Sequence, residues 1–315
     1  MKIAPPGVVA HADWSVSPRK RWLCLAERHR GGYTIGAPEP VGEARLLPAR
    51  LVDRSTDERV LLGVDFPLGV PMAWARACRL ASFRELLETA GRGAWRDFYE
   101  LCDSPEDVTL RRPFYPKRPG GTSQQQLVDG LGLASAEGLR RRCERRTDER
   151  NAASPLFWTL GGQQVGRAAI AGWRELLQPA LQADQPRTRL WPFDGGLASL
   201  LEPGCCVIAE TYPAESATQI GLKAPGRGWS KRRQSDRALH AIAISRWAFR
   251  RRVTVGEALV PLLRDGFTDL KTGEDQFDAL LGVCGMLEVV LGGRPEMPPM
   301  PNERRLIEGW ILGQR

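Results

Sequence analysis

The sequence has no pair of cysteines at C-x-x-C spacing, and none of its 7 cysteines has histidines near it at the spacing of a zinc site. Neither a disulfide framework nor a structural zinc site is therefore expected, and a reducing cytoplasm is the natural compartment. The first residues contain no apolar stretch followed by a small-residue cleavage site, so no secretory signal is expected.

Long apolar runs are also missing. The most apolar stretch, 277–293, is interrupted by Glu288 and preceded by acids, which makes it too polar to span a bilayer. No membrane partner is expected. A chain of 315 residues with 42% hydrophobic and 26% charged residues can bury a substantial core. Because no internal repeat interrupts the pattern, we expect a single domain over residues 1–315.

Lysine is scarce: it supplies only 6 of the 45 basic residues. The net charge is nevertheless +8, with a pI near 9.4, and favours a polyanionic partner such as DNA or RNA. The basic residues are bunched at Arg111–Arg112, Lys117–Arg118, Arg140–Arg142, Arg145–Arg146, Lys231–Arg233 and Arg250–Arg252. The alternative is that these bunches are solvated helix faces, and charge alone does not decide between the two.

The hydrophobic periodicity predicts an α/β fold. Strands are expected at 7–15, 20–29, 33–41, 58–64, 187–192 and 205–211. Helices are expected at 71–80, 82–90, 94–102, 135–146, 165–182, 233–252, 256–264 and 273–292. The first three strands should be antiparallel. The Arg-rich stretch of about 103–186, punctuated by Gly and Pro, is expected to be a mainly helical insertion in a core of 1–102 and 187–315.

Carboxylates stand at the ends of several of these elements. Asp13 closes the first strand, and Asp65 and Glu210 each end an apolar strand just before a turn that contains proline. Asp275 and Asp278 are three residues apart and share one face of the last helix. Because α/β proteins bind ligands outside the carboxyl ends of their strands, we expect these acids to converge on one site. The alternative for each acid alone is a turn former or a helix cap.

Converging carboxylates imply a cofactor. Without basic partners they would repel one another and raise their own pKa values, and a hard cation, Mg²⁺ or Mn²⁺, is the usual resolution. Two such ions about 4 Å apart can activate a water and stabilise the leaving oxygen in phosphodiester hydrolysis. The acids therefore predict a metal-dependent hydrolase that needs no nucleophilic Ser or Cys.

Four motifs resemble the DUF429 family of predicted RNase H-like nucleases. They are A-D-W-S at 12–15, G-V-D-F-P-L-G-V-P at 63–71, A-E-T-Y-P-A-E at 209–215 and E-D-Q-F-D-A-L at 274–280. Their order and spacing agree across nearly the whole chain. The resemblance implies a mixed five-stranded sheet that opens with three antiparallel strands, has helices on both faces and carries the insertion between strands 4 and 5.

The same resemblance implies the site. Its catalytic residues would be Asp13, Asp65, Glu210, Asp275 and Asp278, and its metal ligands Asp13, Asp65, Asp275 and Asp278. Lys231 falls near the place where the family carries a Lys after the E-x-x-P turn, and Arg146-Thr-Asp148 looks like its R-x-T/D segment. Lys231 and Arg146 are therefore candidate phosphate or substrate contacts, with plain surface charge as the alternative.

Two alternatives remain open. His11 lies two residues before Asp13 on the same side of its strand, so it is either a proton shuttle or a strand histidine with a structural role. The chain as a whole is either a Mg²⁺- or Mn²⁺-dependent nuclease or a non-catalytic nucleic-acid-binding or scaffold protein that keeps the RNase H-like fold. Metal-independent binding with a steep salt dependence would distinguish the second function from the first.

Overall fold

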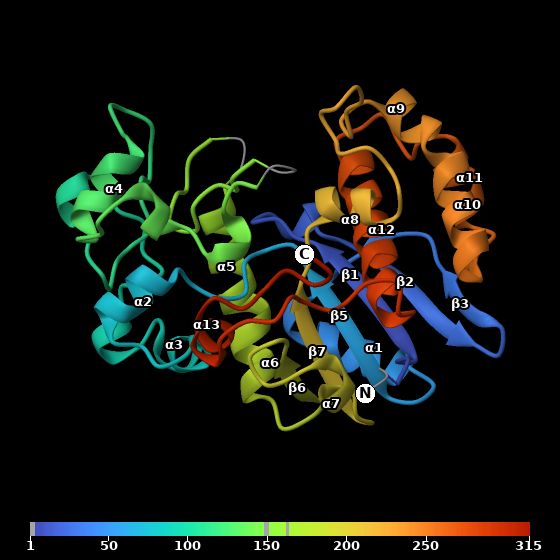
Figure 1. Ribbon diagram of the computed structural model, residues 1–315, viewed down its shortest axis with the longest axis horizontal. Coiled ribbons are helices and arrows are strands. Elements are labelled where there is room, and N and C mark those ends of the chain that lie inside the picture. Colours follow the sequence, from blue (N-terminus) through green and yellow to red (C-terminus); the bar gives the residue numbers. More distant parts are fainter. Residues whose placement is uncertain (1–3, 148–150, 162–163) are drawn as a thin grey trace. The chain divides into compact units, whose positions relative to one another are not determined.

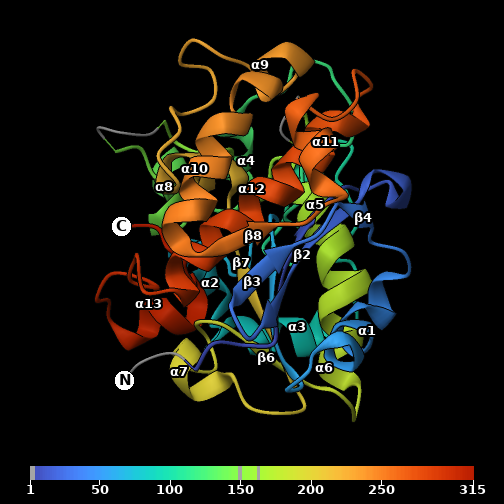
Figure 2. The ribbon, with the colours of Figure 1, turned by 90° about the vertical axis from the view of Figure 1, so that its right-hand side faces the viewer.

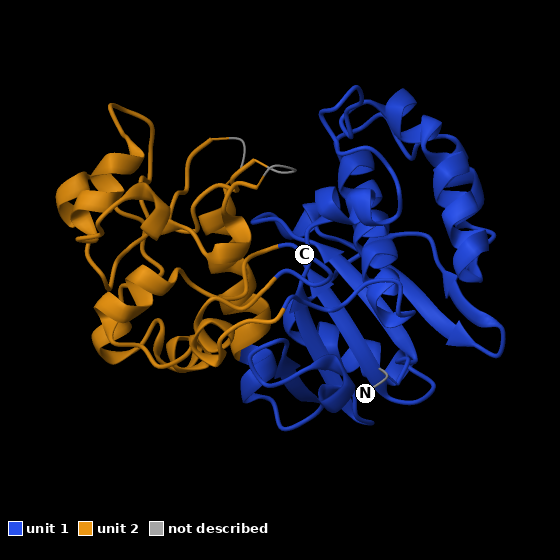
Figure 3. Ribbon diagram, viewed as in Figure 1, with its two compact units in different colours: residues 1–65, 179–298, 311–315 blue, residues 66–178, 299–310 orange. Residues whose placement is uncertain are grey.

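The chain forms two compact units. The computed structural model describes residues 4–147, 151–161 and 164–315 (Figure 1). Unit 1 comprises the described residues of 1–65, 179–298 and 311–315, and unit 2 those of 66–178 and 299–310 (Figure 3). All the strands found in the described residues belong to unit 1.

Unit 1 is built on one mixed sheet, which has eight strands in the described residues. The strands are β1 (Val8–Asp13), β2 (Trp22–His29), β3 (Gly32–Ile35), β4 (Glu39–Pro40), β5 (Arg59–Val64), β6 (Arg187–Leu190), β7 (Cys205–Glu210) and β8 (Val253–Val255). Their order is β6-β7-β5-β1-β2-β3-β8, with β4 paired to β2. β1, β2 and β3 are antiparallel, and β5, β6, β7 and β8 join the sheet in parallel.

The α/β class and the three antiparallel opening strands are confirmed, but the predicted number of five strands is wrong. The expected strand at 33–41 divides into β3 and β4, because the chain leaves β3 after Ile35 and pairs again with β2 at Glu39–Pro40. The strand-like stretch at 187–192 forms β6, beside β7. β8 lies between two expected helices and follows β3 in parallel. Its three residues are too few to carry a strand period of their own.

Helices cover both faces of this sheet (Figure 2). α12 (Thr272–Val290) packs on β1 and β2, and α8 (Pro213–Gln219) packs on α12. α1 (Leu47–Arg54) covers the other face. β1 and β7 are buried along their whole length, as expected for apolar strands covered on both sides.

The remaining α-helices of unit 1 are all shorter than α12. They are α6 (Gln178–Gln182, whose first residue belongs to unit 2), α7 (Leu197–Leu200), α9 (Gln234–Leu239), α10 (Ala241–Arg251) and α11 (Leu259–Arg264). The expected helix at 233–252 is therefore two helices that meet at His240. No helix in the described part of the chain is long and apolar enough to cross a membrane.

Unit 2 is helical and irregular. Its α-helices are α2 (Met72–Cys78), α3 (Phe83–Thr89), α4 (Gln124–Gly130), α5 (Val165–Gly172) and α13 (Asn302–Ile307). The helices predicted at 94–102 and 135–146 are only short 3-10 turns, at Gly93–Trp95, Ala136–Leu139 and Arg142–Glu144. In 135–146, Gly138 and five arginines interrupt the apolar helical stripe, whereas in 94–102 the aromatic residues Trp95, Phe98 and Tyr99 are buried without an α-helix.

The boundaries of unit 2 differ from those of the predicted insertion, 103–186. The unit begins at Phe66, ends its first segment at Gln178, and also includes residues 299–310. An aromatic cluster explains the earlier start. The ring of Trp74, on α2, lies 5.0 Å from that of Phe157, and Phe98 stacks on Trp173 at 6.1 Å. These contacts bind the segment 66–102 to the stretch predicted as the insertion.

Candidate active site

The carboxyl ends of β1 and β5 place two acids side by side. The parallel register pairs Ala12 with Val64, so the next residues, Asp13 and Asp65, are neighbours that point to the same face of the sheet. The backbone N–H of Trp14 donates a hydrogen bond to Oδ1 of Asp65 at 2.6 Å. Asp13 is buried, and Asp65 is half-buried. The pairing of β1 with β5 therefore builds one half of the site.

The start of α12 supplies the other half. Asp275 lies in its first turn, where the helix dipole favours an acid, and Asp278 follows one turn later. The helix crosses β1 closely at Gly282, where an added Cβ would meet the ring of His11 at 2.2 Å. His11 and Asp13 share a face of β1, so α12 lies on the face that carries Asp13 and Asp65.

The electrostatics show that these four carboxyls form one cluster. Burial, followed by the charges of Asp65, Asp278 and Asp275, raises the pKa of Asp13 well above its usual range. Burial and the charge of Asp278 raise the pKa of Asp65 to about 7, although the hydrogen bond from Trp14 opposes this. Burial and Asp278 raise the pKa of Asp275 to about 6. Each acid thus resists ionisation chiefly because it is buried, and the charges of neighbouring acids add to this for Asp13, Asp65 and Asp275.

Lys231 provides the counter-charge. Its Nζ donates to Oδ2 of Asp278 in a short ion pair, and both side chains are largely buried. Burial opposes the charge on Lys231, but Asp278, Asp13 and Glu274 together raise its pKa. The second carboxylate oxygen of Asp278, Oδ1, is buried and has no hydrogen-bond partner among the described residues. The structure places Lys231, predicted as a phosphate contact, against the acids themselves.

A firmly packed loop holds Lys231 in this position. The guanidinium of Arg237, which is buried, donates to the backbone carbonyls of Lys231, Gly266 and Thr268. Trp229 packs on Phe277 of α12, with ring centroids 6.2 Å apart. Arg237 was not among the predicted site residues, because no local sequence pattern marks an arginine that binds only backbone carbonyls.

Glu210 is not brought to this cluster. In the parallel register it lies beside Val64, one residue out of phase with Asp65, so its side chain points to the opposite face of the sheet. Its backbone carbonyl accepts a hydrogen bond from Leu312 N–H at 2.8 Å. Thr211, the next residue, lies on the face of the four acids, where its methyl group packs at Gly63.

His11 lies in the core, between β1 and α12. It is fully buried, and neither ring nitrogen has a hydrogen-bond partner of standard geometry among the described residues. Burial lowers its pKa to about 3, so the ring is neutral, although the backbone of Ala279 is close enough to oppose this in part. Its neutral ring packs closely against Gly282 of α12.

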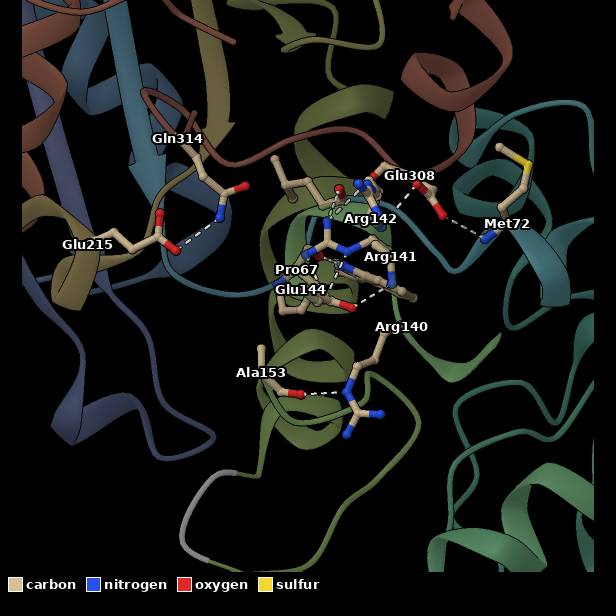
Figure 4. Close-up of polar contacts among 12 residues, drawn as sticks. Pro67, Met72, Arg140, Arg141, Arg142, Glu144, Ala153, Glu215, Glu308 and Gln314 are labelled. Atoms are coloured by element: carbon tan, nitrogen blue, oxygen red, sulfur yellow. Dashed lines mark hydrogen bonds and ion pairs between the residues drawn. The ribbon is translucent and has the colours of Figure 1, made fainter. Parts of the chain in front are cut away.

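The arginines of unit 2 have mixed roles. Arg146 is exposed, and Asp148 of the R-x-T/D segment lies outside the described residues. Arg141 is fully buried: it forms an ion pair with Glu144 at 2.8 Å and donates to the carbonyls of Leu68 and Glu308 (Figure 4). The Arg140–Arg142 bunch is therefore partly a structural contact, and Arg141 is not available to a nucleic acid.

The four acids offer the type of ligand that a hard divalent cation prefers, but their present spacing is not that of a metal site. They offer oxygen ligands, an unpartnered Asp278 Oδ1 and excess negative charge. Within the described residues, however, no group of three or more His, Cys, Asp or Glu is spaced to hold a metal ion as it stands. A bound cation would have to draw the carboxylates together and take the place of the Lys231 ammonium on Asp278.

The chain was compared with protein-family models, curated proteins and solved structures. No family model matches the chain, and neither the curated proteins nor the solved structures give a match. The resemblance to the DUF429 family therefore rests on its four motifs alone.

Proposed function

We propose that the chain is a Mg²⁺- or Mn²⁺-dependent nuclease of the RNase H-like kind, with Asp13, Asp65, Asp275 and Asp278 as its metal ligands. The observation that carries the proposal is the convergence of these four buried or half-buried carboxyls from two strand ends and one helix, where neighbouring acids add to burial in raising the pKa of Asp13, Asp65 and Asp275. Strand order supports it too: β3-β2-β1-β5-β7, with three antiparallel strands first, fits the fold that the DUF429 resemblance implies.

The residues of this chain would divide the work. A divalent cation, when bound, supplies Lewis-acid stabilisation and an activated water for phosphodiester hydrolysis. Asp13 and Asp65 would bind it from the sheet, with Asp65 oriented by the Trp14 N–H. Asp275 and Asp278 would bind it from α12. Glu210 is left out of the proposed site because its side chain faces the other side of the sheet.

The test is cleavage of single-stranded, double-stranded, branched and hybrid nucleic acids in the presence of Mn²⁺. Asp65→Asn keeps the shape of the side chain and the acceptor for Trp14, so loss of activity would report the lost charge. We expect cleavage to fall at least about a hundredfold, as for a group that stabilises the transition state. Asp53→Asn, at an exposed acid of α1, is the matched control. Equal cleavage by wild type and Asp65→Asn would refute the assigned site.

A second candidate function, a non-catalytic nucleic-acid-binding or scaffold protein, is favoured by the Lys231–Asp278 ion pair. That pair already compensates part of the negative charge that a metal would otherwise neutralise. This function requires nucleic-acid binding in EDTA that Asp65→Asn leaves unchanged, together with no cleavage of any of the four substrates.

A further inference from the structure

The surface of unit 1 carries an apolar face, on α10, whose residues do not pack into the core of the unit. The inner side of α10 presents Ile244 and Trp247 to the interior, and Trp247 donates to Glu288 of α12. The outer side also carries large apolar residues: Ile242 is 65% exposed and Phe249 is 85% exposed. A helix that is apolar on two sides is normally covered on both.

The outer side of α10 forms one wall of a groove. The groove has a volume of about 610 Å³ and is lined by residues of α10, β8 and α11. Ile242, Phe249, Val255, Val260 and Leu263 supply most of its apolar lining. Ile242 and Phe249 are seven residues apart, two helical turns along the same face. The two side chains therefore extend the apolar wall of the groove along two turns of α10, a length over which a docked helix can make repeated contacts.

The charges of the groove are positive. Arg246 and Arg250 line it one turn apart on α10, and neither forms an ion pair within the described ranges. Arg264 also lines it and is paired with Asp265 at 2.8 Å. Such a groove complements a segment that is apolar on one side and acidic on the other.

We propose that this groove docks an acidic amphipathic helix of a partner protein. A second copy of the chain is a poorer occupant, because a two-fold pairing would bring the arginines of two molecules with net charge +8 together. A nucleic acid is also a poorer occupant. Phe249 is the single aromatic residue of the lining, and aliphatic side chains cannot stack on bases.

The test uses a fluorescein-labelled model peptide of about 18 residues with leucine at helical three- and four-residue spacing and glutamate elsewhere. Its binding to the full chain is measured by fluorescence anisotropy. Phe249→Ser removes the most exposed apolar contact without touching the core, and Arg246→Glu with Arg250→Glu reverses the rim charge. Leu46→Ser, at an exposed leucine away from the groove, is the control. A peptide with lysine in place of glutamate tests the charge.

We expect saturable binding of the acidic peptide, weakened at least about tenfold by Phe249→Ser and by the double arginine change but not by Leu46→Ser. The lysine peptide should bind at least about tenfold more weakly. The proposal is overturned if the acidic peptide does not bind at about 1 mM protein, or if Phe249→Ser leaves its affinity unchanged. It is also overturned if Phe249 is required for self-association in sedimentation or for binding of a labelled oligothymidine.

Discussion

Asp65 occupies a position where its negative charge opposes folding. Its pKa in the folded chain is about 7, above the ordinary value of 3.8. Between those pH values the folded state holds a proton that the unfolded state has released. The contribution of Asp65 to stability is therefore complete below the ordinary pKa and is lost as pH rises through about 7.

Asp65→Asn should stabilise the metal-free protein at high pH, because the amide carries no charge to bury. We expect the free energy of unfolding to rise by roughly 1–3 kcal/mol near pH 8 and to change little near pH 4. Urea unfolding in EDTA at the two pH values measures this. A variant that is less stable than wild type at the higher pH would contradict the elevated pKa.

Lys231 and a divalent cation would compete for the same oxygen atoms of Asp278. In Lys231→Met the side chain keeps nearly its length but loses the ammonium group. The variant should therefore bind Mn²⁺ about tenfold more tightly than wild type. Titration followed by the electron paramagnetic resonance of free Mn²⁺ measures this without any nuclease assay. Lys223→Met, at an exposed lysine, is the control. Weaker Mn²⁺ binding by Lys231→Met would mean that Lys231 supports the metal instead of opposing it.

The sequence predicted the acids of the cluster but not their geometry. Asp13, Asp65, Asp275 and Asp278 could be found because each closes an element or shares a helix face. Glu210 met the same criterion, yet the face on which a strand-end side chain lies depends on register, and a shift of one residue reverses it. The contact of Lys231 with Asp278 joins residues 47 positions apart, which no local pattern encodes.

At the scale of elements, the close crossing of α12 over β1 depends on Gly282. Gly282→Ala would place a methyl group against the ring of His11. Alanine favours helices by about 1 kcal/mol over glycine, but overpacking a rigid core costs roughly 1–3 kcal/mol. Because the His11 ring already packs tightly against the helix, we expect the overpacking to dominate and the protein to be destabilised in urea unfolding.

Gly31→Ala is the control: nothing lies near the added methyl group, so this change should shift the free energy of unfolding by less than about 0.5 kcal/mol. Equal stability of Gly282→Ala and wild type would show that the ring can move aside.

Long, strongly patterned elements were predictable, whereas short ones were not. The apolar strands β5 and β7 and the long helix α12 have enough residues to show their period. β8 has three residues and exists through its pairing with β3, some 220 positions earlier in the chain. The sequence predicts a helix at 233–252 but does not say which of its apolar residues reach the core.

At the scale of the whole chain, the division into units reflects packing that composition does not reveal. Residues 66–102 continue directly from a core strand and were expected to stay with it. They join unit 2 because Trp74 and Phe98 contact Phe157 and Trp173 there. A change of composition near residue 103 marks where arginine and glycine become frequent, and not where the aromatic contacts begin.

Net charge also acts at this scale, and its consequence is testable apart from catalysis. A chain of +8 that binds nucleic acid through phosphates should lose affinity linearly with the logarithm of salt concentration. Arg232 is well placed to contribute: it follows Lys231, its side chain is 82% exposed, and its ion pair with Glu274 is 4.0 Å long. Removing one phosphate contact should lower the salt slope by about 1.

Arg232→Ala should therefore lower the slope, whereas Arg45→Ala should not. Arg45 is also exposed but is engaged by Glu43. Both slopes can be measured by anisotropy with a labelled single strand in EDTA, which prevents metal-dependent cleavage. A reduction confined to Arg232→Ala would place the strand beside the acidic cluster, where a nuclease needs it. Equal slopes for both variants and wild type would remove Arg232 from the binding surface, and binding without salt dependence would mean that the basic residues do not contact phosphates.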